Sequence, residues 1–229
     1  MAQYPKLFSE WSIRNCQIKN RVVFPPTCPT WVSDPWNGLF IDMATDYYEE
    51  RAKGGVGLII IGGTHVHPSS IMAPLLMPQL FDDRQIEPLS KIADAVHKHG
   101  CKLAIQLWHS GVRGFPGYKQ APGYDSDATW YTVSPSQVPL GEFPGASTPK
   151  ELDEDEIQEI IAAYGSAATR AMAAGLDGVE LHLSHGYLPW QFLSPLYNKR
   201  SDKWGGSYEK RLRFPLEVLQ SMRDAVGDE

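Results

Sequence analysis

The sequence predicts an α/β fold of parallel strands alternating with helices, the (β/α)8 barrel class, and three observations lead to it. Short apolar runs alternate four times with longer segments of helical periodicity, an order that produces right-handed crossovers between parallel strands. Polar residues gather near the ends of the runs, where a barrel enzyme carries its chemistry. No G-x-G-x-x-G follows the first run, which disfavours the alternative, a doubly wound dinucleotide-binding sheet.

The composition is typical of one globular domain over residues 1–229, with 42% hydrophobic and 21% charged residues. A net charge of −6 and the absence of a basic stripe argue against a nucleic-acid partner. No apolar run approaches the roughly 18 residues needed to span a bilayer, so we expect no membrane partner. Cys16, Cys28 and Cys101 include no C-x-x-C pair, which predicts no metal site within this segment and reduced thiols in a cytoplasmic protein.

The first half of the chain contains a hairpin and two strand–helix units. Residues 7–18 form a small apolar hairpin that would close the bottom of a barrel. Residues 21–26 form a strand ended by prolines, and Asp42–Lys53 form a helix stopped by two glycines. Residues 56–61 are a continuous apolar run ending at Gly62 and Gly63, which is typical of a parallel strand covered on both faces.

The second half repeats this alternation. We expect a helix over residues 86–99, because Pro88 is tolerated in a first turn and Gly100 stops the helix. The remaining elements are, in order, a strand at Lys102–Trp108, a long loop at 110–149, a helix at 153–174, a strand at 178–183, a second loop, and a helix at Tyr208–Val226.

Four strand–helix units are half of the eight that close a barrel. Four curved parallel strands leave two open edges and uncovered apolar rows, which favour pairing with further strands. We therefore expect this segment to be the N-terminal half of one barrel domain. The missing strands would come from residues beyond Glu229, from a complementing half-barrel chain, or from a homo-oligomer.

The most informative residues follow the fourth predicted strand. His182 and His185 lie three residues apart, and Tyr187 comes next. Two imidazoles at this spacing can donate hydrogen bonds to one oxygen and stabilise developing negative charge. A nearby tyrosine can act as a general acid. On its own, H-x-x-H is more often hydrogen-bonded structure than a site, and a metal site would need a third ligand that the sequence does not supply.

The run from His182 to Gly206 resembles the signature of the old yellow enzyme family of flavin oxidoreductases, H-x-x-[HN]-G-Y-L…F-L-S-P…N-x-R-x-D-x-[YW]-G-G. Three other segments resemble the family in the same order, and together the matches cover nearly the whole chain. These segments are Phe24-Pro25-Pro26-Thr27, residues 47–59 and residues 106–111.

This resemblance implies FMN bound at the top of a (β/α)8 barrel, with NAD(P)H as the reductant. It implies that Pro25, Pro26 and Thr27 lie against the isoalloxazine ring, with the Thr27 hydroxyl at the O4 edge. Gly63 would offer backbone close to the ring, since glycine permits close approach, and Gln106 would bind the pyrimidine edge. The alternative for Thr27 is an ordinary β-branched strand residue.

For the substrate, the resemblance implies a small enone or enoyl compound whose C=C bond is reduced. His182 and His185 would bind the carbonyl oxygen and Tyr187 would protonate the α carbon. The alternative within the family is an amine dehydrogenase or demethylase, which often carries a C-terminal extension with a 4Fe-4S cluster. The stretch from Asp46 to His67, with Gly62 where many ene-reductases have glutamate, resembles the larger multidomain members more.

The chain also departs from the family pattern. Val112 separates Gly111 from Arg113, where the family has arginine directly after glycine. The family's flavin-contacting arginine on the fifth strand and its phosphate-binding backbone at the seventh and eighth strands would lie beyond Glu229.

Overall fold

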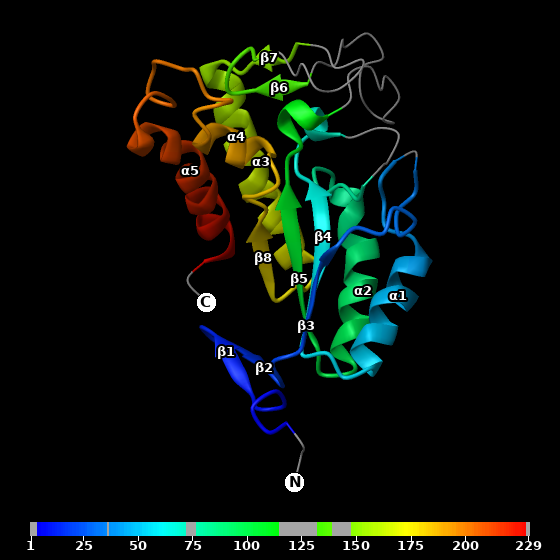
Figure 1. The fold of residues 1–229 in the computed structure, drawn as a ribbon. Coiled ribbons are helices and arrows are strands. Elements are labelled where there is room, and N and C mark those ends of the chain that lie inside the picture. The colour runs from blue at the N-terminus through cyan, green and yellow to red at the C-terminus, as the bar shows by residue number, and fades with distance from the viewer. Residues whose placement is uncertain (1–3, 36, 72–76, 115–131, 139–147, 228–229) are drawn as a thin grey trace.

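The computed structural model describes residues 4–35, 37–71, 77–114, 132–138 and 148–227. At its centre is a parallel sheet whose four strands occur in the order β3, β4, β5 and β8 (Figure 1). The strands span Val23–Thr27, Leu58–His65, Lys102–Trp108 and Gly178–Leu181. All four run in one direction with each strand beside its predecessor, which confirms the predicted succession of strand–helix units.

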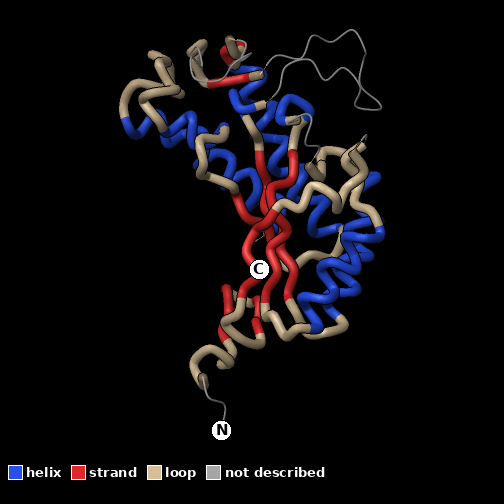
Figure 2. The backbone as a smooth tube through the Cα atoms, turned by 45° about the vertical axis from the view of Figure 1, so that its right-hand side comes forward, coloured by secondary structure: helices blue, strands red, loops and turns tan. Residues whose placement is uncertain are grey.

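The long helices lie around the sheet on one side, as the outer layer of a barrel does (Figures 1 and 2). They are α1 (Asp42–Lys53), α2 (Ile86–His97), α3 (Glu154–Ala173) and α5 (Tyr208–Val226). The side chains buried between helices and sheet form one continuous core, and its largest fully buried members include Tyr48, Tyr164, Phe192, Trp204 and Phe214.

Helix starts follow local sequence signals. Asp153 caps α3, because its side chain accepts the Glu156 N–H while the Glu156 carboxylate accepts the Asp153 N–H, a reciprocal capping box. Ser207 caps α5 through the Lys210 N–H. The expected helix at residues 153–174 therefore begins one residue later, with Asp153 as its cap.

The predicted hairpin consists of β1 (Trp11–Ile13) and β2 (Cys16–Ile18) and lies beyond the N-terminal ends of the sheet strands (Figure 2). Polar bonds hold the segment that follows it to the turns there. Asn20 Nδ2 donates to the Gly55 carbonyl at 2.8 Å, and Lys19 Nζ donates to the His99 carbonyl at 2.6 Å. The opposite end of the sheet is left for the site.

Several boundaries differ from the sequence expectation. The strand expected at 56–61 begins at Leu58 and continues through Gly62 and Gly63 to His65. Its register against β3 shifts between Phe24 and Thr27. A Cβ on Gly62 would lie 2.1 Å from the Thr27 carbonyl oxygen, so the missing side chain lets the two strands approach. The glycines are thus part of the strand and not its end.

The other corrections concern element ends and loops. The strand expected at 21–26 is Val23–Thr27, the helix expected at 86–99 ends at His97, and the strand expected at 178–183 ends at Leu181. The expected loops contain short elements: η1 (Pro68–Ser70), η2 (Asp83–Gln85), η3 (Gly111–Arg113), β6 (Val133–Ser134), β7 (Lys150–Glu151) and α4 (Leu188–Leu193). Residues 115–131 and 139–147 of the long predicted loop lie outside the described residues. No described helix is long and apolar enough to cross a membrane.

We predict that Gly62→Ala destabilises the fold by about 3 kcal/mol or more, because its Cβ would collide with backbone that cannot move aside. Gly178→Ala is the matched control, since a Cβ there finds its nearest neighbour at 4.0 Å on another sheet strand. The measurement is urea unfolding of both variants. Equal stability of the two would contradict the importance of the close approach between β3 and β4.

Candidate active site

The carboxyl ends of the four strands bring the predicted site residues to one end of the sheet. Thr27 is paired with Ile61 across β3 and β4, and Gln106 is paired with Glu180 across β5 and β8. His182 directly follows β8, and its N–H donates to the Leu107 carbonyl at 3.0 Å. The sheet register thus places His182 at the end of β5.

His182, His185 and Tyr187 form a compact aromatic cluster on the loop between β8 and α4. Ring centroids are 5.0 Å apart for the histidine pair, 5.0 Å for His182 and Tyr187, and 6.4 Å for His185 and Tyr187. The turn is tight because His185 and Gly186 both have a positive φ, of 58° and 77°. A non-glycine residue in that region is strained and is commonly found at functional sites.

The two histidines bond to each other. His182 Nδ1 accepts the Ser184 N–H at 3.3 Å, so its proton lies on Nε2, which faces His185 Nδ1 at 3.3 Å. Donation by both rings to one oxygen, as the sequence predicts, requires His182 Nε2 to exchange this long contact for the substrate. That role stays a prediction.

Two members of the cluster, His182 and Tyr187, are kept neutral by burial. Burial, and secondarily the neighbouring His185, lower the pKa of His182 to about 4. Burial also raises the pKa of Tyr187, with Arg113 opposing it, so the phenol keeps its proton at neutral pH. His182 and Tyr187 therefore offer an uncharged N–H donor and an uncharged O–H donor.

Trp108 supports the cluster from below. Its indole packs edge-on against Tyr187 at 4.8 Å and stacks on His65 at 4.6 Å. His65 Nδ1 bonds to Ser70 Oγ at 2.8 Å, and burial lowers the pKa of His65 to about 3. A neutral, fully buried stack therefore fixes the floor beneath Tyr187.

A directed hydrogen-bond chain ties together the loops that follow β4 and β5. The Gly111 N–H donates to His109 Nδ1 at 3.1 Å, and His109 Nε2 faces Ser69 Oγ at 3.0 Å. The Ser69 hydroxyl then donates to His67 Nδ1 at 2.8 Å, since His67 Nε2 is left to donate to Glu159 at 3.2 Å. Because every donor meets an acceptor, this chain locks the two loops in one arrangement.

The residues expected beside a flavin also lie at the carboxyl ends of the sheet strands, which form the rim of the site. Pro25 and Thr27 are exposed on β3, and Pro26 between them is intermediate. A Cβ on Gly63 would lie 3.3 Å from the Trp108 ring, so the lack of a side chain at Gly63 leaves space beside this ring. Gln106 Nε2 donates to Glu180 Oε1 at 2.5 Å, which leaves its amide oxygen as an acceptor.

Comparison with known proteins defines the relationship. The model of the NADH:flavin oxidoreductase / NADH oxidase family matches residues 6–229. The chain belongs to this family. It is 40% identical to an NADH oxidase of Thermoanaerobacter brockii over 229 residues, which are all of this chain and 33% of that protein. It is also 41% identical to an N,N-dimethylglycine/sarcosine dehydrogenase of Chromohalobacter salexigens over 230 residues, 99% of this chain and 31% of that enzyme.

A solved structure gives the same result. The Old Yellow Enzyme from Pichia sp. AKU4542 superposes with a TM-score of 0.86 at 32% identity, covering 97% of this chain and 57% of that one. The chain thus spans about a third of the two curated relatives and just over half of this neighbour. The expected fold class, the first part of an old yellow enzyme-type barrel, is confirmed.

Two residues near the site were given no role from the sequence. Cys28 follows the three expected flavin contacts, and its sulfur lies 3.5 Å from where a Gly63 Cβ would be. Burial raises the pKa of this thiol to about 11, although the Gly63 N–H bonds to it. Arg113 lies over Gly186 and Tyr187. The paired glycines were the sequence signal that could have found Cys28, whereas Arg113 was noted only because Val112 displaces it from the family's position.

The inserted Val112 is absorbed without disturbing the rim. It is buried in η3, and its N–H donates to Gln191 Oε1 at 3.3 Å.

Among the residues that the structure describes, no group of three or more His, Cys, Asp or Glu side chains is placed to hold a metal ion. Cys16, Cys28 and Cys101 are free thiols.

We predict that the His182 imidazole titrates at about pH 4, so its hydrogen-bond donor persists throughout the range from pH 5 to 8. His185→Asn should move this pKa upward, because one of the two causes of the shift is removed while burial remains. NMR titration of the ring protons measures both, with the signal assigned by its loss in His182→Asn. A midpoint near the ordinary 6.5 would contradict the buried, neutral ring.

Proposed function

We propose that this chain is the N-terminal part of an FMN-dependent oxidoreductase that uses NAD(P)H to reduce the C=C bond of α,β-unsaturated carbonyl or enoyl substrates. The single observation that carries the proposal is the cluster of hydrogen-bond donors formed by His182, His185 and Tyr187 at the strand ends. Membership of the flavin oxidoreductase family supplies the redox class. The substrate class is inferred from the chemistry of the cluster.

The rim suits the ring of FMN. Exposed Pro25 and Thr27, with Pro26 between them, form an edge against which a flat ring can lie, and the glycine at position 63 prevents a side chain from filling the space. The free amide oxygen of Gln106 suits a ring N–H, since Gln106 Nε2 is already bonded to Glu180. When bound, FMN supplies hydride transfer from NAD(P)H to the substrate.

The residues of this chain then handle the oxygen and the proton. His182 and His185 donate hydrogen bonds to the carbonyl oxygen, which gains negative charge as the β carbon is reduced. Tyr187 transfers its phenolic proton to the α carbon, and its raised pKa ensures that the proton is present at neutral pH. Trp108 and the His65 stack hold the Tyr187 ring in place.

The relative that acts on N,N-dimethylglycine or sarcosine motivates an amine dehydrogenase as the alternative. Carbonyl binding is favoured, because two N–H donors and a protonated phenol match an oxygen acceptor better than an amine. A 4Fe-4S cluster would require ligands outside this segment. A cytoplasmic location remains part of the proposal.

We predict that Tyr187→Phe in the flavin-loaded protein slows reduction of cyclohexenone by about 10²- to 10⁴-fold, while reduction of the flavin by NAD(P)H changes little. The phenylalanine keeps the contact with Trp108 and removes only the proton donor. Stopped-flow absorbance separates the two half-reactions. Equal loss in both would show that Tyr187 does not act as the acid.

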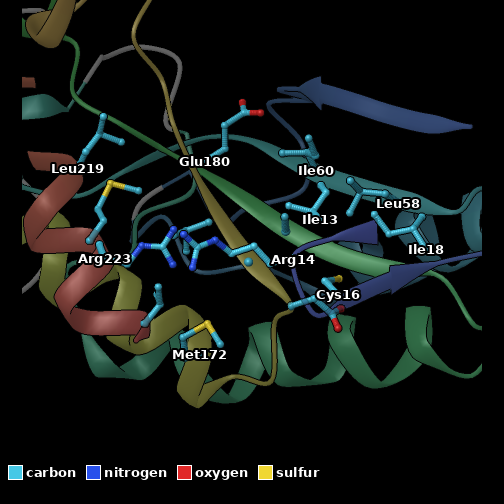
Figure 3. A pocket seen from close by; sticks show the side chains of 16 residues that line it. Ile13, Arg14, Cys16, Ile18, Leu58, Ile60, Met172, Glu180, Leu219 and Arg223 are labelled. Carbon is cyan, nitrogen blue, oxygen red and sulfur yellow. The ribbon is translucent and has the colours of Figure 1, made fainter. Parts of the chain in front are cut away.

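A second candidate role concerns the open edge of the sheet, because a groove lies beside β8. The groove has a volume of about 520 Å³ and is lined mainly by apolar side chains of the hairpin, β4, β8 and α5 (Figure 3). Ile13, Ile60 and Leu219 line the groove, and the side chains of Arg14 and Arg223 also line it and point toward each other. We infer that a strand from the rest of a barrel, from a complementing chain or from another copy, adds to β8 here.

We predict that the 229-residue chain associates with itself in solution and that Leu219→Asp weakens this association, because it places a charge in the groove. Leu216→Asp is the matched control, as Leu216 is also an exposed leucine of α5 but does not line the groove. Light scattering across a concentration series reports the assembly. A well-folded monomeric wild-type chain would contradict an edge that requires a partner.

A further inference from the structure

The guanidinium of Arg113 lies over the turn that carries the catalytic cluster. A Cβ built on Gly186 would lie 3.1 Å from Arg113 Nη2 and 3.2 Å from its Nε, so the missing side chain leaves the space that the guanidinium occupies. Arg113 Cζ is 5.8 Å from the centroid of the Tyr187 ring. The positive charge of Arg113 therefore lies next to two consecutive residues of the turn, Gly186 and Tyr187.

Arg113 is held by its backbone as well as by this contact. It is the last residue of η3, and its N–H donates to the Ser110 carbonyl at 3.3 Å. The preceding Val112 is buried and its N–H is bonded to Gln191, the residue of α4 that also donates to the Gly186 carbonyl at 2.7 Å. The segment that carries Arg113 and the turn beneath its guanidinium are thus fixed to one another.

The charge of Arg113 is not neutralised within the described part of the chain. The ion pairs of that part occupy Arg84, Arg170, Arg200 and Arg213, each with an aspartate or glutamate, but none includes Arg113. Arg113 is exposed, and its guanidinium lies beside Tyr187, whose phenol burial keeps protonated at neutral pH. An accessible guanidinium next to a cluster of hydrogen-bond donors is suited to an anionic oxygen group.

We propose that Arg113 forms an anion subsite of the active site, which binds a carboxylate or phosphate group on the substrate while His182 and His185 bind its carbonyl oxygen. This inference rests on the proposed function. It narrows the substrate class to unsaturated carbonyl compounds that carry a negative charge away from the reacting bond. Neutral enones would react without the contribution of Arg113.

The test compares two aldehydes of the same shape, 4-formylbenzoate and its methyl ester, as ligands of the flavin-loaded protein in calorimetric titrations. We expect the wild-type protein to bind the carboxylate about tenfold more tightly, and we expect 0.5 M salt to reduce this ratio. Arg113→Gln should abolish the preference and Arg113→Lys should retain part of it. Arg213→Gln, which removes an exposed arginine of α5, should leave it unchanged.

Other outcomes would overturn the subsite. An unchanged preference in Arg113→Gln excludes a role in binding the anion, and so does the lack of any preference in the wild-type protein. An equal loss of both ligands in Arg113→Gln would mean that Arg113 only positions Tyr187. A third ligand, 4-formylphenyl phosphate, distinguishes the two anions, because tighter binding than the benzoate assigns the subsite to a phosphate and weaker binding assigns it to a carboxylate.

The proposed function is tested separately on the same preparations. Reduction of neutral cyclohexenone by NAD(P)H does not involve the anion, so its absence would refute the reaction while leaving a measured carboxylate preference intact. Conversely, turnover of cyclohexenone with no carboxylate preference would support the reaction and refute the subsite.

Discussion

The site depends on a close approach of backbone between β3 and β4. Gly62 lies so near the Thr27 carbonyl that any side chain would overlap it. This contact accompanies the register shift between the strands and allows β4 to continue to His65. The Trp108 ring and the thiol of Cys28 both lie beside the position that a side chain on the neighbouring Gly63 would take, so a substitution there would affect both.

Above this contact, rigidity comes from neutral hydrogen bonds and aromatic packing. His67 and His109, in the loops after β4 and β5, are each fixed in one tautomer by a backbone N–H donor, and burial lowers the pKa of both. Such a network is sensitive to the loss of any member, since the partner left behind would be buried without a bond. The rim therefore presents its donors from a scaffold with little freedom to rearrange.

Most of the fold could be predicted from the sequence, because it is encoded locally. Helices α1 and α5 and strand β5 have the predicted bounds, since glycines after both helices, the serine cap of α5 and the apolar run of β5 mark them. The end of strand β4 was predicted too early, because two consecutive glycines usually end a strand. Here Gly62 lacks a side chain because β3 lies too close to leave room for one. Helix α4 is only six residues long and begins beside Pro189, so it has no periodicity to detect.

The candidate site was predictable in composition but not in arrangement. Resemblance to a family could suggest His182, His185 and Tyr187, but the bond between the two rings and the position of Arg113 depend on the left-handed turn at His185 and Gly186. Sequence spacing carries no information about which donor faces which acceptor. The same limit applies to Gln106, whose bond to Glu180 arises from the pairing of β5 with β8.

The histidine pair has a consequence for selectivity in the proposed reaction. Because His182 Nε2 already donates to His185 Nδ1, a ligand oxygen gains a hydrogen bond from His182 only by displacing this contact, and the net benefit for a neutral carbonyl is small. An oxygen that acquires negative charge during the reaction is a much stronger acceptor and wins the exchange decisively. The occupied donor of His182 therefore contributes little to binding the ground state and most to stabilising the transition state.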